Sequence, residues 1–211
     1  MKQLAKPTRS TFRGEICGVG TTSGHRIVIG RWEQSPLGPF ADVMVESPDG
    51  VRTLLAPSET VADFVSTTYT FDTIEIVAVD ARRTATTLTV DAGSLNVRAV
   101  IGRRSGIGYV LRCVPRPIAE APWWAAAIGP VAKFVMRGVR TTGTAGNGRR
   151  EWYGASDARK ITTVDATSAG IDLGTLTDVW PPVRFGFGST PRRPSAVRVV
   201  STVEEISSDH V

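Results

Sequence analysis

Residues 73–114 read TIEIVAVDARRTATTLTVDAGSLNVRAVIGRRSGIGYVLRCV and carry the clearest structural pattern in the chain. β-Branched and other apolar residues gather in four short runs, at 73–80, 85–91, 95–101 and 107–114. Turn-forming residues separate these runs, and connections this short join only antiparallel neighbours. We therefore predict a four-stranded antiparallel meander.

The remainder of the chain also favours strands over helices. Short apolar runs between Gly, Pro and Ser turns predict five more strands, at Phe12–Val19, Arg26–Trp32, Asp42–Glu46, Val51–Leu55 and 195–205.

Three segments favour helices. PSETVADFV begins at Pro57, and Ser58 followed by acidic residues is typical of a helix N-terminus. Residues 158–174 are interpreted as a further short helical region. Residues 122–138 are mostly apolar but are interrupted at Gly129-Pro130 and are too short for a convincing membrane span. We expect a helix covering the core here. The alternative is an interfacial contact with a membrane or a partner through Trp123 and Trp124.

Length and composition are those of an ordinary globular chain. The 211 residues are 41% hydrophobic and 21% charged, which suits one generous hydrophobic core. We see no internal repeat or linker, and predict a flexible tail over 1–11, a single β domain over 12–206 and a polar tail over 207–211. The N-terminal residues are charged and lack an apolar signal core, which predicts a cytoplasmic location.

The charge pattern bears on partners. The net charge is +5 and most basic residues are Arg, which favours anionic partners. Arg pairs at 82–83, 103–104, 149–150 and 192–193 fall in predicted turns, where they either solvate the turn or form an anion-attracting rim. No helix-turn-helix, basic helix or aromatic-basic sheet motif stands out, so we expect no nucleic-acid partner.

Several chemistries are disfavoured by what the chain lacks. Cys17 and Cys113 make neither a disulfide framework nor a zinc motif. Only His25 and His210 are available, which argues against histidine-based hydrolysis and histidine-ligated metals. GTAGNG, at 143–148, has no following Lys-Ser/Thr, so we interpret it as a flexible hairpin turn. We predict no metal and no cofactor.

Polar residues within the predicted meander suggest a binding site. Glu75, Arg98 and Arg112 lie in apolar runs. They either face solvent, which is the commoner case, or line a cavity. There Glu75 would pair with one Arg while the other Arg binds a carboxylate. Tyr153, in EWY, suits either a pocket wall or the edge of a core.

SPLGPFADVMVE, residues 35–46, makes a tight turn and then enters an apolar strand that carries Asp42. It resembles the S-P-x-G-P-[YF]-x-[ED] segment of the acetoacetate decarboxylase-like superfamily. The resemblance implies a closed, cone-like antiparallel β fold with a central cavity, assembled as a homo-oligomer, with Asp42 at the cavity mouth. The family's Schiff-base lysine lies in a G-x-P-K-like segment, which this chain lacks, and no lysine occurs between Lys6 and Lys133. We therefore do not expect Schiff-base decarboxylation.

These observations predict an α+β fold, mainly antiparallel β, with a closed or partly closed β-barrel-like sheet and a few covering helices. Our leading hypothesis is that a small organic, anionic molecule binds in an internal cavity. The candidate ligand-binding residues are Asp42, Glu75, Arg98, Arg112 and Tyr153. One alternative is a lysine-independent lyase or isomerase that uses an acid as general base. The other is a structural or interaction protein with a filled barrel.

Overall fold

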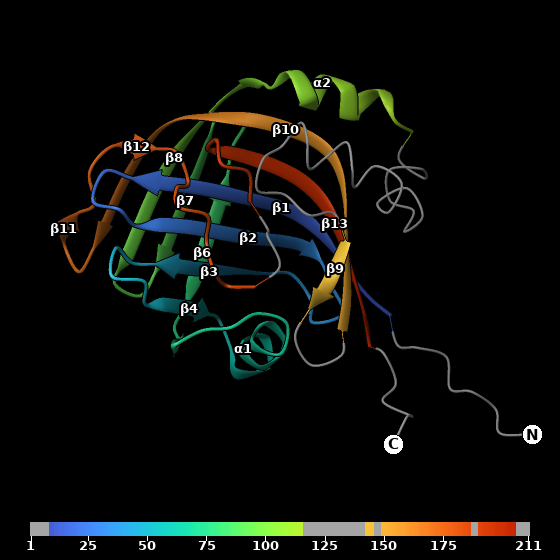
Figure 1. Ribbon diagram of the computed structural model, residues 1–211, viewed down its shortest axis with the longest axis horizontal. Helices are drawn as coiled ribbons and strands as arrows, with labels where there is room; N and C mark the ends of the chain where they lie inside the picture. The colour runs from blue at the N-terminus through green and yellow to red at the C-terminus, as the bar shows by residue number, and fades with distance from the viewer. Residues whose placement is uncertain (1–8, 116–141, 146–148, 187–189, 206–211) are drawn as a thin grey trace, which may run out of the picture.

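The computed structural model describes residues 9–115, 142–145, 149–186 and 190–205 (Figure 1). Within them, thirteen strands join in one strongly curled sheet, with helices α1 (Glu59–Ser66) and α2 (Gly106–Cys113) packed against it. The strands β6, β7 and β8 lie behind β1 to β4, as Figure 1 shows. The predicted α+β fold with a partly closed, barrel-like sheet is confirmed.

The strands of the sheet come from all parts of the described chain. Their bounds are β1 (Arg9–Thr21), β2 (Arg26–Gln34), β3 (Phe40–Glu46), β4 (Arg52–Ala56), β5 (Thr73–Ile76), β6 (Val79–Arg83), β7 (Thr87–Ala92), β8 (Leu95–Arg104), β9 (Thr142–Ala145), β10 (Arg149–Ser168), β11 (Ile171–Asp172), β12 (Leu176–Thr177) and β13 (Ser195–Glu205). The main path through the sheet runs β5-β4-β3-β2-β1-β13-β10-β8-β7-β6. β9 and β11 pair with β10, and β12 pairs with β1.

Side-chain alternation gives the sheet two buried faces. Cys17, Ile29 and Val43 belong to a cluster enclosed by the curl, which also takes in β7, β8 and β10. We call this side the inner face. Ile16 and Val28, one position away in their strands, belong to a second cluster with residues of α1. We call that side the helix face. Because successive side chains of a strand point to opposite sides, one strand supplies both faces.

Helix α1 forms where the sequence predicts it. Ser58 is the N-cap, and its Oγ accepts a hydrogen bond from the backbone N–H of Val61 at 3.3 Å. Val61, Ala62 and Val65 are buried against the helix face. Their spacing of three and four residues is that of an amphipathic helix, so burial of this stripe fixes α1 on the sheet.

The predicted meander is correct only in its middle. β6, β7 and β8 pair in sequence and antiparallel. Residues 73–76 instead form β5, which pairs parallel with β4 at the other end of the sheet path. α1 is the crossover that joins these parallel strands, and parallel neighbours need such a connection. The prediction treated 73–80 as one strand and did not use the preceding helix as a crossover that returns 73–76 to the side of β4.

The last predicted strand of the meander, 107–114, is also wrong, because this segment is α2. Ser105 caps the helix by accepting a hydrogen bond from the Gly108 N–H at 3.1 Å. Ile107 and Leu111, four residues apart, pack on the helix-face cluster. Gly108 lets α2 approach β10, because a Cβ there would overlap the carbonyl oxygen of Ala158. An apolar run of eight residues is compatible with either period, and tertiary packing selected the helix.

Predictions also concern residues 158–174, the Gly-rich segment at 143–148 and both ends of the chain. The predicted helical region at 158–174 is wrong, because long strand β10 continues to Ser168 and β11 follows it. β9 and β10 pair antiparallel on either side of the Gly-rich segment, as a hairpin requires, and the turn residues 146–148 lie outside the described residues. β1 begins at Arg9, inside the segment predicted as a tail, and 207–211 lie outside the described residues.

The sequence predicts all four Arg pairs in turns and a helix at 122–138. The pairs at 82–83, 103–104 and 149–150 lie in strands rather than in turns, while 192–193 lie outside strands. The predicted helix at 122–138, with Trp123 and Trp124, falls outside the described residues. In the part of the chain that the structure describes, neither helix is long and apolar enough to cross a membrane.

Candidate functional site

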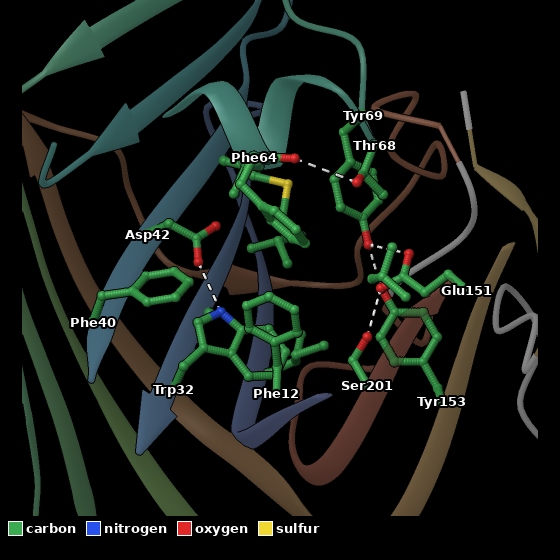
Figure 2. Close-up of a pocket in the computed structure, with 16 residues that line it drawn as sticks. Phe12, Trp32, Phe40, Asp42, Phe64, Thr68, Tyr69, Glu151, Tyr153 and Ser201 are labelled. Carbon is green, nitrogen blue, oxygen red and sulfur yellow. Dashed lines mark hydrogen bonds between the residues drawn. The ribbon is translucent and has the colours of Figure 1, made fainter. Parts of the chain in front are cut away.

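A pocket lies on the helix face, with walls from α1 and from strands β1, β2, β3, β10 and β13 (Figure 2). Two buried acids, Asp42 and Glu151, line it, and we call it the carboxyl pocket. Its volume is about 40 Å³. By the same measure one water molecule needs about 10–15 Å³, so the pocket accommodates roughly three waters or a small organic group.

The turn at Ser35 delivers Asp42 to this pocket. Ser35 Oγ accepts a hydrogen bond from the Leu37 N–H at 3.0 Å, and its carbonyl accepts one from Gly38 at 3.1 Å. Gly38 takes a positive φ of 81°, which glycine adopts readily, and the chain then enters β3 at Phe40. Two residues later Asp42 points to the helix face. The carboxylate therefore lies on the side of the sheet opposite the enclosed inner face.

Among the residues that the structure describes, one hydrogen bond orients the Asp42 carboxyl group. Trp32 Nε1 donates to Asp42 Oδ1 at 3.0 Å (Figure 2). Gly30 lies directly opposite Asp42 in the β2–β3 register. A Cβ at Gly30 would overlap both Asp42 Oδ1 and Trp32 Nε1, so the absence of a side chain there makes room for this pair.

The second acid belongs to a longer hydrogen-bond network. Glu151 Oε1 accepts from Ser201 Oγ at 2.7 Å, and Oε2 accepts from the Tyr69 hydroxyl at 3.0 Å. The Tyr69 and Tyr153 hydroxyls also hydrogen-bond to each other (Figure 2). Because Tyr69 donates its proton to Glu151, its oxygen is left to accept from Tyr153. Both carboxylate oxygens of Glu151 thus have donors.

Aromatic rings form much of the remaining wall. Phe12 lies 5.7 Å from Trp32 and 4.9 Å from Phe64, measured between ring centroids. Phe40 lies 6.3 Å from Phe12 in an edge-to-face arrangement. Rings packed in this way are rigid and exclude water. The polar atoms of the pocket therefore face a largely apolar enclosure.

Burial controls the protonation of both acids. It raises the pKa of Asp42 to about 7, while the Trp32 hydrogen bond acts in the opposite direction. Burial also raises the pKa of Glu151, opposed first by the hydrogen bond from Ser201. Burial and the neighbouring Glu151 raise the pKa of Tyr69 and Tyr153 well above the usual range, so both hydroxyls remain protonated donors. Asp42 can both hold and release a proton near neutral pH.

The five ligand-binding residues predicted from the sequence do not lie together in one site. Asp42 and Tyr153 line the carboxyl pocket. Glu75 lies on β5 and Arg98 on β8, and both are exposed. Arg112, on α2, lines a different cavity. Glu75 and Arg98 thus face solvent, which is the commoner case predicted from the sequence, and the alternative pairing of Glu75 with Arg98 or Arg112 forms no ion pair among the described residues.

Sequence reasoning missed several residues of the pocket. These are Trp32, Tyr69, Glu151 and Ser201. Glu151 and Tyr153 are two residues apart in one strand and so share a face, which is a signal that EWY already carried. Tyr69 is 82 residues from Glu151 in the chain, and no local pattern could have joined them. Among the described residues, no cluster of three or more His, Cys, Asp or Glu could hold a metal ion.

Comparisons with known proteins give likeness in structure alone. No protein-family model matches the chain, and no curated protein matches it by sequence. Acetoacetate decarboxylase from Legionella pneumophila aligns over 97% of this chain and 89% of its own, with 11% identity and a TM-score of 0.42. A second acetoacetate decarboxylase structure covers 96% of this chain and 93% of its own, with 12% identity and a TM-score of 0.37. Both of these solved structures are acetoacetate decarboxylases, the family that residues 35–46 resemble.

Proposed function

We propose that this chain binds a small, uncharged organic molecule in the carboxyl pocket. One observation carries the proposal. Two buried carboxyl groups, Asp42 and Glu151, open on a mainly apolar pocket whose described lining contains no basic residue. Buried acids with raised pKa values, gathered in a cavity, are typical of functional sites.

The charge of the pocket selects against an anion. A carboxylate ligand would meet no cation in the described lining, and above neutral pH ionised Asp42 would repel it strongly because the site is buried. The anionic ligand expected from the sequence is therefore not assigned to this pocket. A carbonyl or hydroxyl compound fits better, because protonated Asp42 can donate to it while the aromatic rings bury its apolar part.

A second function, proton transfer, is favoured by the pKa of Asp42. A general acid or base works best when its pKa lies near the working pH, and burial brings that of Asp42 to about 7. Its carboxylate would abstract a proton next to a carbonyl group and return it to another carbon. This is an isomerase chemistry that uses no lysine. Cytoplasmic location and homo-oligomeric assembly stay predictions from the sequence.

A ligand screen tests the binding proposal. Thermal shift and ligand-observed NMR would be measured with small ketones, alcohols, phenols and carboxylates. We expect neutral compounds to bind saturably and Trp32→Phe, which removes the indole donor to Asp42, to weaken them. Asp91→Asn, an exposed acid on β7, is the matched control for Asp42→Asn. If wild type, Trp32→Phe and Asp42→Asn all bind the ligand with the same affinity, the carboxyl pocket is not the binding site.

Deuterium exchange separates catalysis from binding. A bound ketone incubated in D₂O would lose its α-protons if Asp42 transfers them, and NMR detects the loss directly. We expect Asp42→Asn to abolish exchange even at ligand concentrations that saturate the weakened binding of the variant. Exchange that continues in Asp42→Asn would rule out the proton-transfer role and leave the binding proposal standing.

A further inference from the structure

The inner face carries a second cavity, larger and differently charged. Its volume is about 420 Å³, within the range typical of small-molecule sites. Ala196 belongs both to the inner-face hydrophobic cluster and to the cavity lining, so the cavity continues from the filled part of the curl. Five arginines line it, and we call it the arginine cavity: Arg31, Arg83, Arg112, Arg159 and Arg198.

The sheet register arranges part of this charge in a row. Glu15 of β1 lies opposite Arg31 of β2 on one side and opposite Arg198 of β13 on the other. Arg198 in turn lies opposite Asp157 of β10. Cations and anions therefore alternate across four adjacent strands. Cross-strand neighbours of opposite charge stabilise one another, and this row holds its members in place.

The acids of the cavity are already engaged by arginines. Glu15 pairs with Arg83 at 2.9 Å, and this ion pair is largely buried. Glu33 receives Arg31 at 2.8 Å and Arg198 at 3.3 Å. These two carboxylates thus hold three of the five cations.

The third acid of the cavity, Asp157, pairs mainly with an arginine that does not line the cavity. Asp157 accepts two hydrogen bonds from Arg104, at 2.7 and 2.9 Å, and Arg104 is not part of the lining. Arg159 reaches Asp157 only at 4.0 Å. Arg112 makes no ion pair with an acid in the described part of the chain. The cavity therefore keeps a positive surplus, centred on Arg112 and Arg159.

We propose that the arginine cavity binds a small organic anion that carries two or more negative charges, with Arg112 and Arg159 as its principal partners. A guanidinium group offers paired N–H donors that match the oxygens of a carboxylate or a phosphate. A recessed site strengthens this attraction relative to open solvent. The site is distinct from the carboxyl pocket, since it lies on the opposite face of the sheet and has the opposite charge.

Isothermal titration calorimetry at fixed ionic strength tests the proposal. The probes are succinate and citrate for carboxylates, glycerol 3-phosphate for organic phosphates, and inorganic phosphate alone. We expect saturable binding of at least one organic probe that weakens as salt is added. We expect Arg112→Gln and Arg159→Gln each to raise its Kd about tenfold or more, since hydrogen bonds to charged groups are the strong ones. Inorganic phosphate binding as tightly as every organic probe would overturn the organic-anion assignment.

Controls on the same strands sharpen the test. Arg82→Gln removes an exposed arginine that neighbours Arg83 on β6 and does not line the cavity, and it should leave the Kd unchanged. Asp42→Asn should also leave it unchanged, so failure here and failure of the proposed function are separable. An Arg82→Gln effect as large as that of Arg112→Gln would mean nonspecific attraction and would sink the proposal. So would the absence of binding by all probes at millimolar concentration, with near-ultraviolet circular dichroism confirming that each variant is folded.

Discussion

Trp32 and Asp42 are diagonal neighbours across the β2–β3 pair, with the indole N–H donating to the carboxyl oxygen at 3.0 Å. The pair depends on Gly30, because a methyl group there would overlap both partners. We predict that Gly30→Ala lowers the free energy of unfolding by about 1–3 kcal/mol, the usual cost of overpacking a core. Urea unfolding measures this directly. Gly106→Ala is the control, since a Cβ at Gly106 meets nothing within 4 Å. Similar losses in both variants would contradict the close packing around Asp42.

The raised pKa of Asp42 predicts a pH-dependent stability. From its ordinary value of 3.8 up to about 7, folded Asp42 keeps its proton while the unfolded chain has released it. Unfolding then releases a proton, so stability falls as pH rises, by at most about 1.4 kcal/mol per pH unit. Above pH 7 the full cost is present, and below pH 4 it vanishes.

Asp42→Asn isolates this contribution, because the amide keeps the shape of the group and cannot ionise. We expect the stability of Asp42→Asn relative to wild type to increase as pH is raised from about 5 to about 7, following the linkage above. Glu151 titrates in both proteins and cancels in the comparison. Denaturant unfolding across this range provides the measurement. A difference between the two proteins that does not vary with pH would show that Asp42 titrates normally.

The Tyr69 hydroxyl supplies one of the donors to Glu151. Tyr69→Phe removes that donor and leaves a buried carboxylate oxygen without it, so we predict a loss of about 1–3 kcal/mol in unfolding free energy. Tyr109→Phe is the matched control, because Tyr109 is 59% exposed on α2. The two variants would be compared by thermal and urea unfolding. A cost no greater than that of Tyr109→Phe would remove Tyr69 from the network.

Strand β3, which carries Asp42, ends in a buried ion pair. Glu46 is fully buried at the end of β3, and it pairs with Arg26 at 3.2 Å and with Arg184 at 2.7 Å. We predict that Glu46→Gln destabilises the fold by about 3–5 kcal/mol, because the buried Arg26 loses its counter-charge. Asp91→Asn breaks an exposed pair with Arg82 and should cost less than about 1 kcal/mol. Comparable unfolding curves for the two variants would be inconsistent with the burial of Glu46.

Local patterns predicted much of the secondary structure. The alternation in 87–101 gave strands β7 and β8 correctly, and the Ser58 cap predicted the start of α1. These features depend on neighbouring residues only: a repeat of two for strands, or a side-chain oxygen placed before the first turn of a helix. Residues 107–114 show the limit, since eight residues fit both periods and packing against β10 selected the helix.

The residues of the carboxyl pocket could likewise be predicted only in part from local patterns. Residue patterns alone predict that a tight turn leads into the strand that carries Asp42, and they show Tyr153 next to a second aromatic residue in EWY. They could not determine which face of the sheet each residue occupies, because a shift of one residue in register reverses every side chain. Only the tertiary structure brought Tyr69 to Glu151, placed Asp42 beneath α1 and left Glu75 and Arg98 exposed. Pairing between distant strands decides those positions, and it depends on burying two faces of one curled sheet at once.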